Sequence, residues 1–199
     1  MKKEIKSIFL LSIGCMLVFA VMYPAVLWGI AQFAAPNGGA GEKIVVNDQV
    51  VGFELIGQTF TSDRYFNSRP SAVGYDAAGT GGSNKGPLNP EYLEEVEVRR
   101  DSILAQNPEI SAADIPTDMV TASGSGLDPH FSPQAAYMQV PRISKVRDIP
   151  VEQLQELVTN QIEKPLFGFL GPKERVHVLR LNIALDELDN QLNSNSITN

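Results

Sequence analysis

The stretch TASGSGLDPHFSP, residues 121–133, holds the densest group of side chains that could do chemistry. Ser123 and Ser125 offer hydroxyls, and the carboxylate of Asp128 and the imidazole of His130 follow them. Hydroxyl, imidazole and carboxylate are the parts of a serine nucleophile with its base and orienting acid. Glycines at the start of a helix also suit phosphate binding. The stretch is therefore a candidate for nucleophilic catalysis, for phosphate binding, or for a turn that leads into a helix.

The motif tests favour the turn. A P-loop needs a lysine directly after its last glycine, but a leucine follows Gly126. A dinucleotide-binding fingerprint needs a third glycine where Pro129 stands, and neither serine lies in a G-x-S-x-G nucleophile elbow. A triad would require near neighbours in one loop to converge. We therefore expect a glycine-permitted bend and a helix capped by Ser132, with contact to a partner or ligand as the alternative role.

Four more polar residues could contact a phosphate, a carboxylate or another subunit. Gln139 and Arg142 lie three positions apart and would share one face of a helix, where Arg142 could hold an anion through two hydrogen bonds. The alternative is an ordinary exposed polar face. Arg64 and Arg69 stand among the aromatic residues of a long loop. They could pair with the acidic surface or contact a partner chain.

Charge and composition exclude several classes of function. The chain has 199 residues and a net charge of −7; its first six residues carry +2, so the rest carries −9. An acidic body argues against a nucleic-acid binder, which needs a basic face. The single cysteine, Cys15, rules out an internal disulfide and a cysteine metal site, and the two histidines lack ligand spacing. We expect no catalytic centre, no metal site and no intrinsic cofactor.

An uncharged apolar run over residues 7–35 is long enough to cross a membrane, because the hydrocarbon core needs about 20 apolar residues in a helix. A cleaved signal peptide is the alternative, but its apolar part is usually about 7–15 residues long, and a cleavage site is poorly formed here. Pro24 is expected to kink the helix. The lysines within residues 1–6 favour a cytoplasmic amino terminus and place the remainder outside the cytoplasm.

This organisation predicts an α+β protein, with a single N-terminal transmembrane helix followed by one extracytoplasmic mixed α/β domain. Residues 1–6 form a cytoplasmic tail, and residues 36–42 a glycine-rich tether. The extracytoplasmic domain covers residues 43–192, and residues 193–199 form a frayed tail. In a bacterium the chain would be a single-pass protein of the cell (inner) membrane, with its C-terminal domain periplasmic or extracellular.

Turn and cap signals predict short strands and helices around a long loop over residues 60–90, which is rich in glycine and proline. In order, we expect a hairpin about Asn47-Asp48, a helix from Asn89 to Gln106, a strand at 118–122, a helix over 133–147 broken or kinked at Pro141, a helix over 151–162, a strand at 176–180, and a last short helix capped by Asn182 and ending at Leu188.

Five strings carry a family resemblance that covers residues 8–189. They are YPAVLWGIAQ, GFELIGQTF, YFNSRPSAVGYDAAGTGGSNKGPLNP, VTASGSGLDPHFSPQAAYMQVPRISKVR and GFLGPKERVHVLRLNIALD. Any one of them alone would be weak, but their joint occurrence in this order is highly specific. Together they resemble the family of C subunits, KdpC, of the bacterial Kdp potassium-transporting P-type ATPase.

The resemblance implies an accessory subunit of an ATP-driven, high-affinity potassium uptake complex. Its partners would be a channel-like A subunit that carries potassium, a B subunit that hydrolyses ATP, and a small F subunit. The family is described as aiding assembly and as a catalytic chaperone that raises the ATP affinity of the B subunit. The resemblance implies that Gln139 contacts nucleotide, and the Ser-Gly-Ser-Gly string is sometimes regarded as a nucleotide signature. ATP could then be shared with the B subunit.

Two mechanisms and one alternative function are open at this point. An extracytoplasmic domain would lie away from cytoplasmic ATP and could dock on the A subunit near the potassium entrance, with the anchor packed on its helices. In the second mechanism the domain helps to bind ATP. The alternative is a membrane-tethered solute-binding or adhesion module, which would need a sizeable ligand pocket and independence from partner subunits. The lipid bilayer is a partner in every case.

Overall fold

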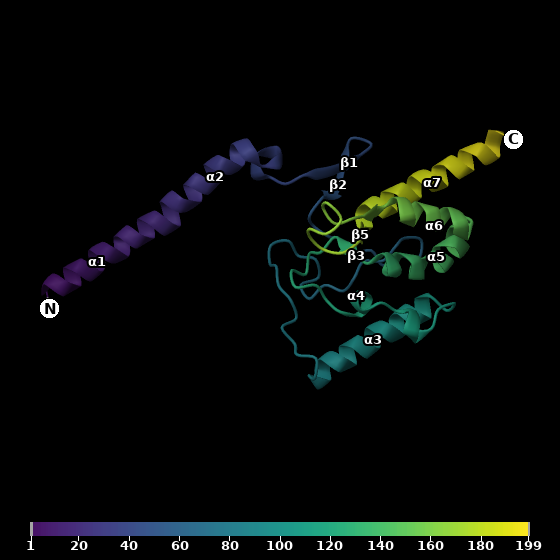
Figure 1. Cartoon of the computed structure of the whole chain (residues 1–199), viewed down its shortest axis with the longest axis horizontal. Helices are drawn as coiled ribbons and strands as arrows, with labels where there is room; N and C mark the ends of the chain where they lie inside the picture. Colours follow the sequence, from purple (N-terminus) through teal and green to yellow (C-terminus); the bar gives the residue numbers. More distant parts are fainter. Residues whose placement is uncertain (1, 199) are drawn as a thin grey trace. The chain divides into compact units, whose positions relative to one another are not determined.

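The computed structural model describes residues 2–198, without the side chains of Lys2 and of residues 195–198. The contacts between residues divide the chain into two compact units, Met1–Glu54 and Leu55–Asn199, and each is described by itself (Figure 1). The division falls later than residue 43, where composition placed the start of the domain. The first unit holds, in order, α1 (Lys2–Met16), η1 (Leu17–Met22), α2 (Tyr23–Ala34), η2 (Pro36–Gly39), β1 (Lys43–Val46) and β2 (Gln49–Phe53).

One helical run, from Lys3 to Ala34, is long and apolar enough to cross a membrane. At about 1.5 Å per residue it is roughly 48 Å long, well over the roughly 30 Å of the hydrocarbon core. The run passes Pro24 by widening into the π-helix η1, where the amide of Tyr23 donates to the carbonyl of Val18, five residues back. Proline cannot donate a backbone hydrogen bond, and a wider turn before it accommodates that loss. The predicted single long apolar helix is confirmed.

The first unit ends in the β-hairpin that the sequence predicted. β1 and β2 pair antiparallel, and Val46 lies opposite Gln49 across a two-residue turn. Asn47 and Asp48 fill that turn with φ values of 49° and 61°. Both residues lie in the left-handed region that a type I′ turn requires, and Asn and Asp tolerate that region better than most residues.

The second unit combines helices with one small sheet, in agreement with the predicted α+β class. Its strands form an antiparallel sheet in the order β3-β5-β4. The elements are α3 (Pro90–Gln106), η3 (Ala112–Asp114), α4 (Thr117–Val120), β3 (His130–Phe131), α5 (Pro133–Arg147), α6 (Val151–Asn160), β4 (Ile162–Glu163), β5 (Arg175–His177) and α7 (Val178–Thr198).

The core of this unit lies where α5, α6 and α7 pack on one another and on β5 (Figure 1). By contrast, α3 has no buried residue and lies along the outside, next to α4. Helix starts follow the predicted caps: the Asn89 side chain accepts from the amide of Tyr92, and the Ser132 hydroxyl accepts from the amide of Ala135. The fully buried apolar residues of these central elements are Ala135, Ala136, Ile143, Leu154, Val158, Val176, Leu181 and Leu185.

The strand predicted at 118–122 is wrong, because α4 occupies this position. Pro116 precedes the helix, and the Thr121 hydroxyl donates to the carbonyl of Thr117 one turn back. The carboxylate of Asp118 accepts from both the amide and the hydroxyl of Ser132. The residue types of this stretch suit a strand, but α4 places Asp118 beside the start of α5. Pro141 does not break α5, which continues through it from Pro133 to Arg147.

The predicted end of the chain also needs correction. The strand stops at His177, and α7 begins at the next residue, so the predicted strand over 176–180 is too long. His177 caps α7, because its Nδ1 accepts from the amide of Arg180 at 3.3 Å. Asn182 lies inside the helix and is not its cap. α7 continues past Leu188 to Thr198, and so includes most of the expected tail; Asn199 lies outside the described residues.

Candidate functional site

Two amide side chains hold the backbone of a loop segment, residues 63–67, that has no strand partner of its own. Asn182 accepts from the amide of Phe66 at 2.8 Å and donates to its carbonyl at 3.0 Å. Gln139 does the same for Asn67, at 2.7 Å and 3.3 Å. Buried backbone groups need hydrogen-bond partners, and these side chains supply what a neighbouring strand would supply in a sheet. We call residues 63–67 the clamped segment.

The carboxamide of Gln139 is fully occupied by the fold. Its oxygen accepts from Asn67 and from Arg142, and its nitrogen donates to the carbonyls of Asn67 and Ala135. A carboxamide offers two acceptor and two donor positions, so all four are used. The side chain is also buried, with 1% of the residue exposed. Contact between Gln139 and a nucleotide stays a prediction, and such contact would have to replace hydrogen bonds that hold the clamped segment.

Arg142 binds carbonyl oxygens of the clamped segment. Its guanidinium donates to the carbonyls of Asp63 and Tyr65, to the side-chain oxygen of Gln139 at 2.8 Å, and to that of Asn107 at 3.0 Å. Burial lowers the pKa of this guanidinium. Gln139 and Arg142 do share one face of α5, as predicted. That face is buried, so the alternative of an ordinary exposed polar face is wrong.

Arg147 secures the same segment from the end of α5. Its Nε donates to the carbonyl of Arg64 at 2.7 Å, and its guanidinium lies 4.6 Å from the ring centre of Tyr65. Ion pairs to Asp186 at 2.8 Å and Asp189 at 3.0 Å balance its charge. Burial alone would lower the pKa of Arg147, but its interactions with Asp186, Tyr65 and Asp189 together outweigh burial and raise it. The side chain of Arg64 points outward, is 55% exposed, and lies 3.6 Å from Asp189.

At the Ser-Gly-Ser-Gly loop, two amides are bound by the loop's own serine hydroxyls. The Ser123 hydroxyl accepts from the amide of Gly126 at 2.8 Å, and the Ser125 hydroxyl accepts from the amide of Leu127 at 3.1 Å. A phosphate loop would instead point its amides at the ligand. Gly126 has a φ of 71°, and a Cβ there would lie 2.5 Å from a methyl carbon of Val73. Its glycine is therefore required by the packing of two loops, which agrees with the predicted bend.

Asp128 and His130 lie together, although the sequence offered no reason to expect near neighbours in one loop to converge. The Asp128 carboxylate accepts from the backbone amide of His130 at 3.0 Å and forms an ion pair with Arg69 at 2.7 Å. Burial would raise the pKa of Asp128, but the His130 and Arg69 bonds outweigh it and lower the pKa. The His130 ring stands edge-on to His177, with ring centres 5.2 Å apart. Ser125 bonds within its own turn, so the arrangement serves as a corner between loops.

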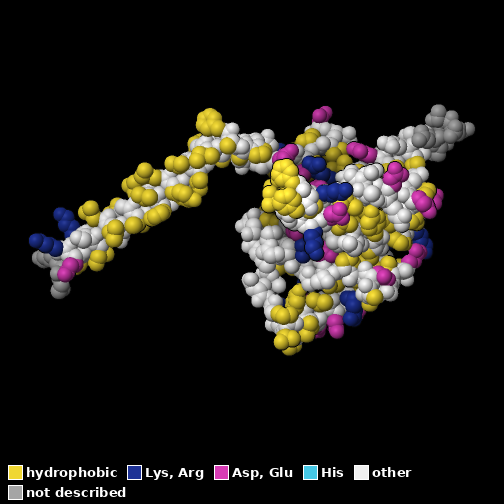
Figure 2. Space-filling view, viewed as in Figure 1, with side chains coloured by type: hydrophobic (Ala, Val, Ile, Leu, Met, Phe, Trp, Pro, Cys, Tyr) yellow, Lys and Arg dark blue, Asp and Glu magenta, His cyan; other side chains and the backbone are white. Residues whose placement is uncertain are grey.

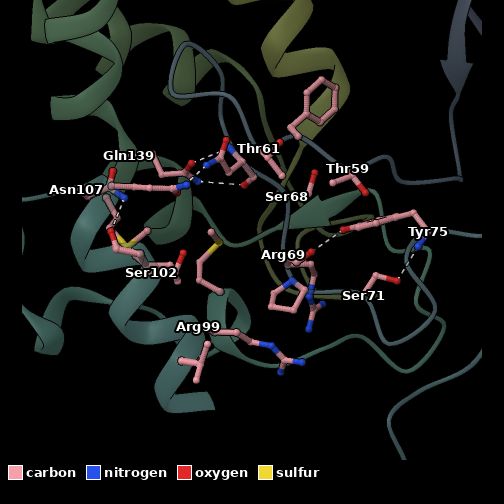
Figure 3. Close-up of a pocket in the computed structure, with 18 of the residues that line it drawn as sticks. Thr59, Thr61, Ser68, Arg69, Ser71, Tyr75, Arg99, Ser102, Asn107 and Gln139 are labelled. Carbon is pink, nitrogen blue, oxygen red and sulfur yellow. Dashed lines mark hydrogen bonds between the residues drawn. The ribbon is translucent and has the colours of Figure 1, made fainter. Parts of the chain in front are cut away.

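A cavity of about 470 Å³ opens between the first part of the long loop and α3 (Figure 3). Gln139 lies at one side of it, and Arg69, Ser71 and Tyr75 lie at the other. The Tyr75 hydroxyl donates to the carbonyl of Arg69 at 2.7 Å, and burial raises the pKa of Tyr75 to about 12. Arg99 on α3 also lines the cavity and pairs with Glu95 at 3.1 Å. Most of the lining surface is apolar, and the Tyr75 hydroxyl and the Arg99 guanidinium at its sides already bind partners within the chain.

Sequence reasoning missed the residues whose partners are distant in the chain. Asn182 was taken for a helix cap, and Asn107 for a helix stop; the spacing around Arg147 gave no signal. A polar residue among apolar helix positions, as at Asn182, is the only pattern that could have pointed to the clamp. Within residues 2–198, with the side chains that are described, no group of three or more His, Cys, Asp or Glu residues could hold a metal ion.

The sequence matches the family described as "KdpC: K+-transporting ATPase, c chain" over residues 5–187. Similar proteins carry the name "Potassium-transporting ATPase KdpC subunit". The one from Bacteroides fragilis (strain YCH46) is 50% identical over 193 residues, which cover 96% of this chain and all of the relative. The one from Flavobacterium psychrophilum is 52% identical and covers 94% of this chain and 99% of the relative. The one from Caldanaerobacter subterraneus is 45% identical, with coverage of 94% and 96%. The chain belongs to the KdpC family, subunits of a potassium-transporting ATPase.

Proposed function

We propose that this KdpC-family chain is a non-catalytic accessory subunit that assembles and stabilises an ATP-driven potassium uptake complex. In this proposal the second unit, Leu55–Asn199, which we call the soluble unit, docks on the channel-like A subunit near the potassium entrance. The apolar helix packs on membrane helices of the complex. ATP hydrolysis belongs to the B subunit, and a small F subunit completes the assembly.

This role is supported by one observation: the polar side chains that were candidates for a functional site stabilise the chain's own fold. Gln139, Arg142 and Arg147 hold a loop in place. Ser123 and Ser125 bind amides of their own loop, and Asp128 joins that loop to Arg69. Groups that serve the fold in this way are poorly placed to carry out a reaction. The exposed surface and the membrane anchor are the parts of the chain that can contact other proteins, and this suits a subunit that binds other subunits.

The proposed orientation puts the soluble unit outside the cytoplasm of a bacterial cell, as a single-pass protein of the inner membrane. It is supported by the lysines in residues 1–6, because positive flanks stay cytoplasmic. A pair of reporters fused after residue 199, one active only in the periplasm and one only in the cytoplasm, tests it. We expect activity from the periplasmic reporter alone. Activity from the cytoplasmic reporter alone would reverse the orientation and bring the domain within reach of ATP.

The assembly role is tested by deleting residues 1–35 and replacing them with a cleavable export signal. We expect the exported soluble unit to co-purify with the A subunit at least about tenfold less well, because the contacts of the membrane helix are lost. The control keeps the anchor and carries Asp101→Asn, an exposed change on α3. Unchanged co-purification and potassium uptake after the deletion would contradict a role for the anchor in assembly.

A direct role in nucleotide binding is the second mechanism, and matched variants separate it from the first. Gln139→Ala and Asn182→Ala each remove a two-bond hold on the clamped segment. If the segment matters only for structure, both variants change the KM for ATP of the assembled complex alike. If Gln139 contacts nucleotide, only Gln139→Ala raises that KM. The comparison is made at equal amounts of assembled complex.

The cavity beside Tyr75 favours one alternative function, a tethered solute-binding module. Its volume of about 470 Å³ lies within the usual range for small-molecule sites, roughly 300–1,000 Å³. This alternative predicts that a small solute raises the melting temperature of the chain without any partner subunit. Ser102→Trp, which places a large side chain in the cavity, should abolish that shift. A panel of amino acids, sugars and organic acids that gives no shift would remove the alternative.

A further inference from the structure

A short hairpin between β4 and β5 projects from the second unit, and we call residues 164–173 the β4–β5 hairpin. Leu166 and Leu170 form an isolated antiparallel bridge, and the amide of Leu170 donates to the carbonyl of Leu166 at 2.9 Å. The turn between them has positive φ values at Phe167 (54°) and Gly168 (80°). These bonds close the turn locally, so the hairpin holds its shape without a core beneath its tip.

The tip carries four large apolar side chains in the open. Leu166 and Leu170 are 61% and 54% exposed, and Phe167 and Phe169 are 80% and 81% exposed. Successive residues of a hairpin point to opposite faces, and all four are more than half exposed, so neither face packs on the domain. Figure 2 shows a projecting group of hydrophobic side chains on the soluble unit, where Figure 1 places the segment that leads into β5. Large exposed apolar groups of this kind mark contact sites.

The base of the hairpin is positively charged in an acidic chain. Lys164 and Lys173 stand at its two ends, both exposed, and no acidic residue lies between them. Glu163 and Glu174 flank these lysines, and Glu163 pairs with Arg175 at 2.8 Å, so residues 163–175 carry a net +1 in a chain that carries −9 beyond residue 6. Exposed apolar side chains with lysines on both sides of them in the sequence suit a membrane surface. Rings enter the region below the headgroups, and ammonium groups reach the phosphates.

A bilayer is within reach of this unit by covalent connection. The membrane-crossing run ends at Ala34, and the second unit begins at Leu55. Twenty-one residues fully extended span at most about 70 Å, and their real path is shorter. The second unit is therefore tethered to the bilayer that the anchor crosses, which raises the effective concentration of lipid around that unit.

We propose that the β4–β5 hairpin inserts its tip into the surface of the bilayer, in the leaflet on its own side, and that Lys164 and Lys173 bind anionic phospholipid headgroups. A fluid phase can surround a projection on every side, which matches the exposure of all four side chains. A protein groove would be matched by one apolar face and one polar face. The inference goes beyond the assembly role and does not depend on it, because it needs only the anchor and the hairpin.

The test places one tryptophan probe at the tip of the full-length chain. Trp28→Phe removes the native tryptophan, and Phe167→Trp adds the probe at an already exposed aromatic position. The chain is reconstituted without partner subunits in vesicles of phosphatidylcholine and phosphatidylglycerol, with or without bromine on the acyl chains. The matched control is Leu88→Trp, at an apolar residue of the same unit that is 88% exposed. Circular dichroism checks that both variants are folded.

We expect brominated lipid to quench the probe at position 167 by roughly twofold or more and to leave the probe at position 88 nearly unchanged, since only a ring within the acyl region meets bromine. Adding Lys164→Gln and Lys173→Gln, or omitting phosphatidylglycerol, should reduce the quenching at position 167. Equal quenching at the two positions, or quenching that ignores both changes of charge, would overturn the proposal. So would a tip probe that stays open to aqueous acrylamide in vesicles and becomes shielded only when other ATPase subunits are added; that result would assign the hairpin to a protein partner.

Discussion

The clamped segment and the β4–β5 hairpin are both irregular loops, and they solve opposite problems. The clamped segment begins in a single turn, closed by the amide of Tyr65 on the carbonyl of Ser62, and buried side chains of α5 and α7 bind the rest of its backbone. The hairpin closes on itself through a tight turn and leaves its apolar side chains outside. The polar residues that bind the clamped segment have the types expected of a functional site, but they are buried and stabilise the fold. The apolar residues of the hairpin have the types expected of a core, but they are exposed to solvent. At both loops, residue type alone gives the wrong prediction of which side chains are buried and which are exposed.

The largest difference between the two loops should appear when one phenylalanine in each is truncated to alanine. Phe66 is fully buried, and Phe169 is 81% exposed. We expect Phe66→Ala to lower the free energy of unfolding by about 3–5 kcal/mol, because it leaves a cavity in the core. Phe169→Ala should change it by less than about 0.5 kcal/mol. Urea unfolding of the full-length chain in detergent, followed by circular dichroism, measures both; equal losses would show that the hairpin is part of the core.

The next largest effect should come from the guanidinium that binds the clamped segment. Arg142→Ala leaves the carbonyls of Asp63 and Tyr65 and the side-chain oxygen of Asn107 without this donor. Unsatisfied buried groups cost about 1–3 kcal/mol each, so we expect a loss near 3–4 kcal/mol. Arg64→Ala, which removes an exposed arginine of the same loop, is the control and should cost less than about 1 kcal/mol. A small loss for Arg142→Ala would mean that water replaces the guanidinium there.

A smaller effect should follow from adding one methyl group where two loops meet. Gly126→Ala puts a Cβ 2.5 Å from Val73 and 2.8 Å from the carbonyl of Gly81, at a φ of 71°. We expect a loss of about 2–3 kcal/mol from strain and overlap. Gly124→Ala, two residues earlier, has open space at its Cβ and should cost less than about 1 kcal/mol. Thermal unfolding of the two variants side by side gives the difference, and similar midpoints would contradict the packing argument.

The smallest effect concerns pH and the corner at Asp128. The folded-state pKa of this carboxyl lies below its usual value, so the ionised form contributes stability above pH 4 or so, and that stability is lost as pH falls through the folded-state pKa. Asp128→Asn should cost about 1 kcal/mol at pH 7 and should weaken the loss of stability in acid. The control is Asp101→Asn, an exposed carboxylate on α3. Unfolding midpoints between pH 3 and 7 would reveal parallel curves if Asp128 made no such contribution.

Whether an interaction could be predicted from the sequence depends on how many positions separate the interacting residues along the chain. The caps at Asn89 and Ser132 and the hairpin turn at Asn47 were predictable, since each depends on neighbours within a few positions. The roles of Gln139 and Asn182 were not, because their partners lie 72 and 116 positions away. The helix at 117–120 was missed for a related reason: Asp118 bonds Ser132, and that tertiary tie favours a geometry that the local residue types do not.

The large separation in sequence between Asn182 and Phe66 affects the order in which parts of the domain can fold while the chain is synthesised. The chain leaves the ribosome amino terminus first, so the anchor and then the loop emerge before α7 exists. Contacts between residues far apart in sequence form late, because the intervening chain must first be brought together. The backbone of Phe66 therefore waits for the last part of the chain, whereas Asn67 can be held by Gln139 once α5 has formed. A nascent chain stopped before residue 182 would expose this loop to proteases and chaperones, and completion of α7 would be the step that closes the domain.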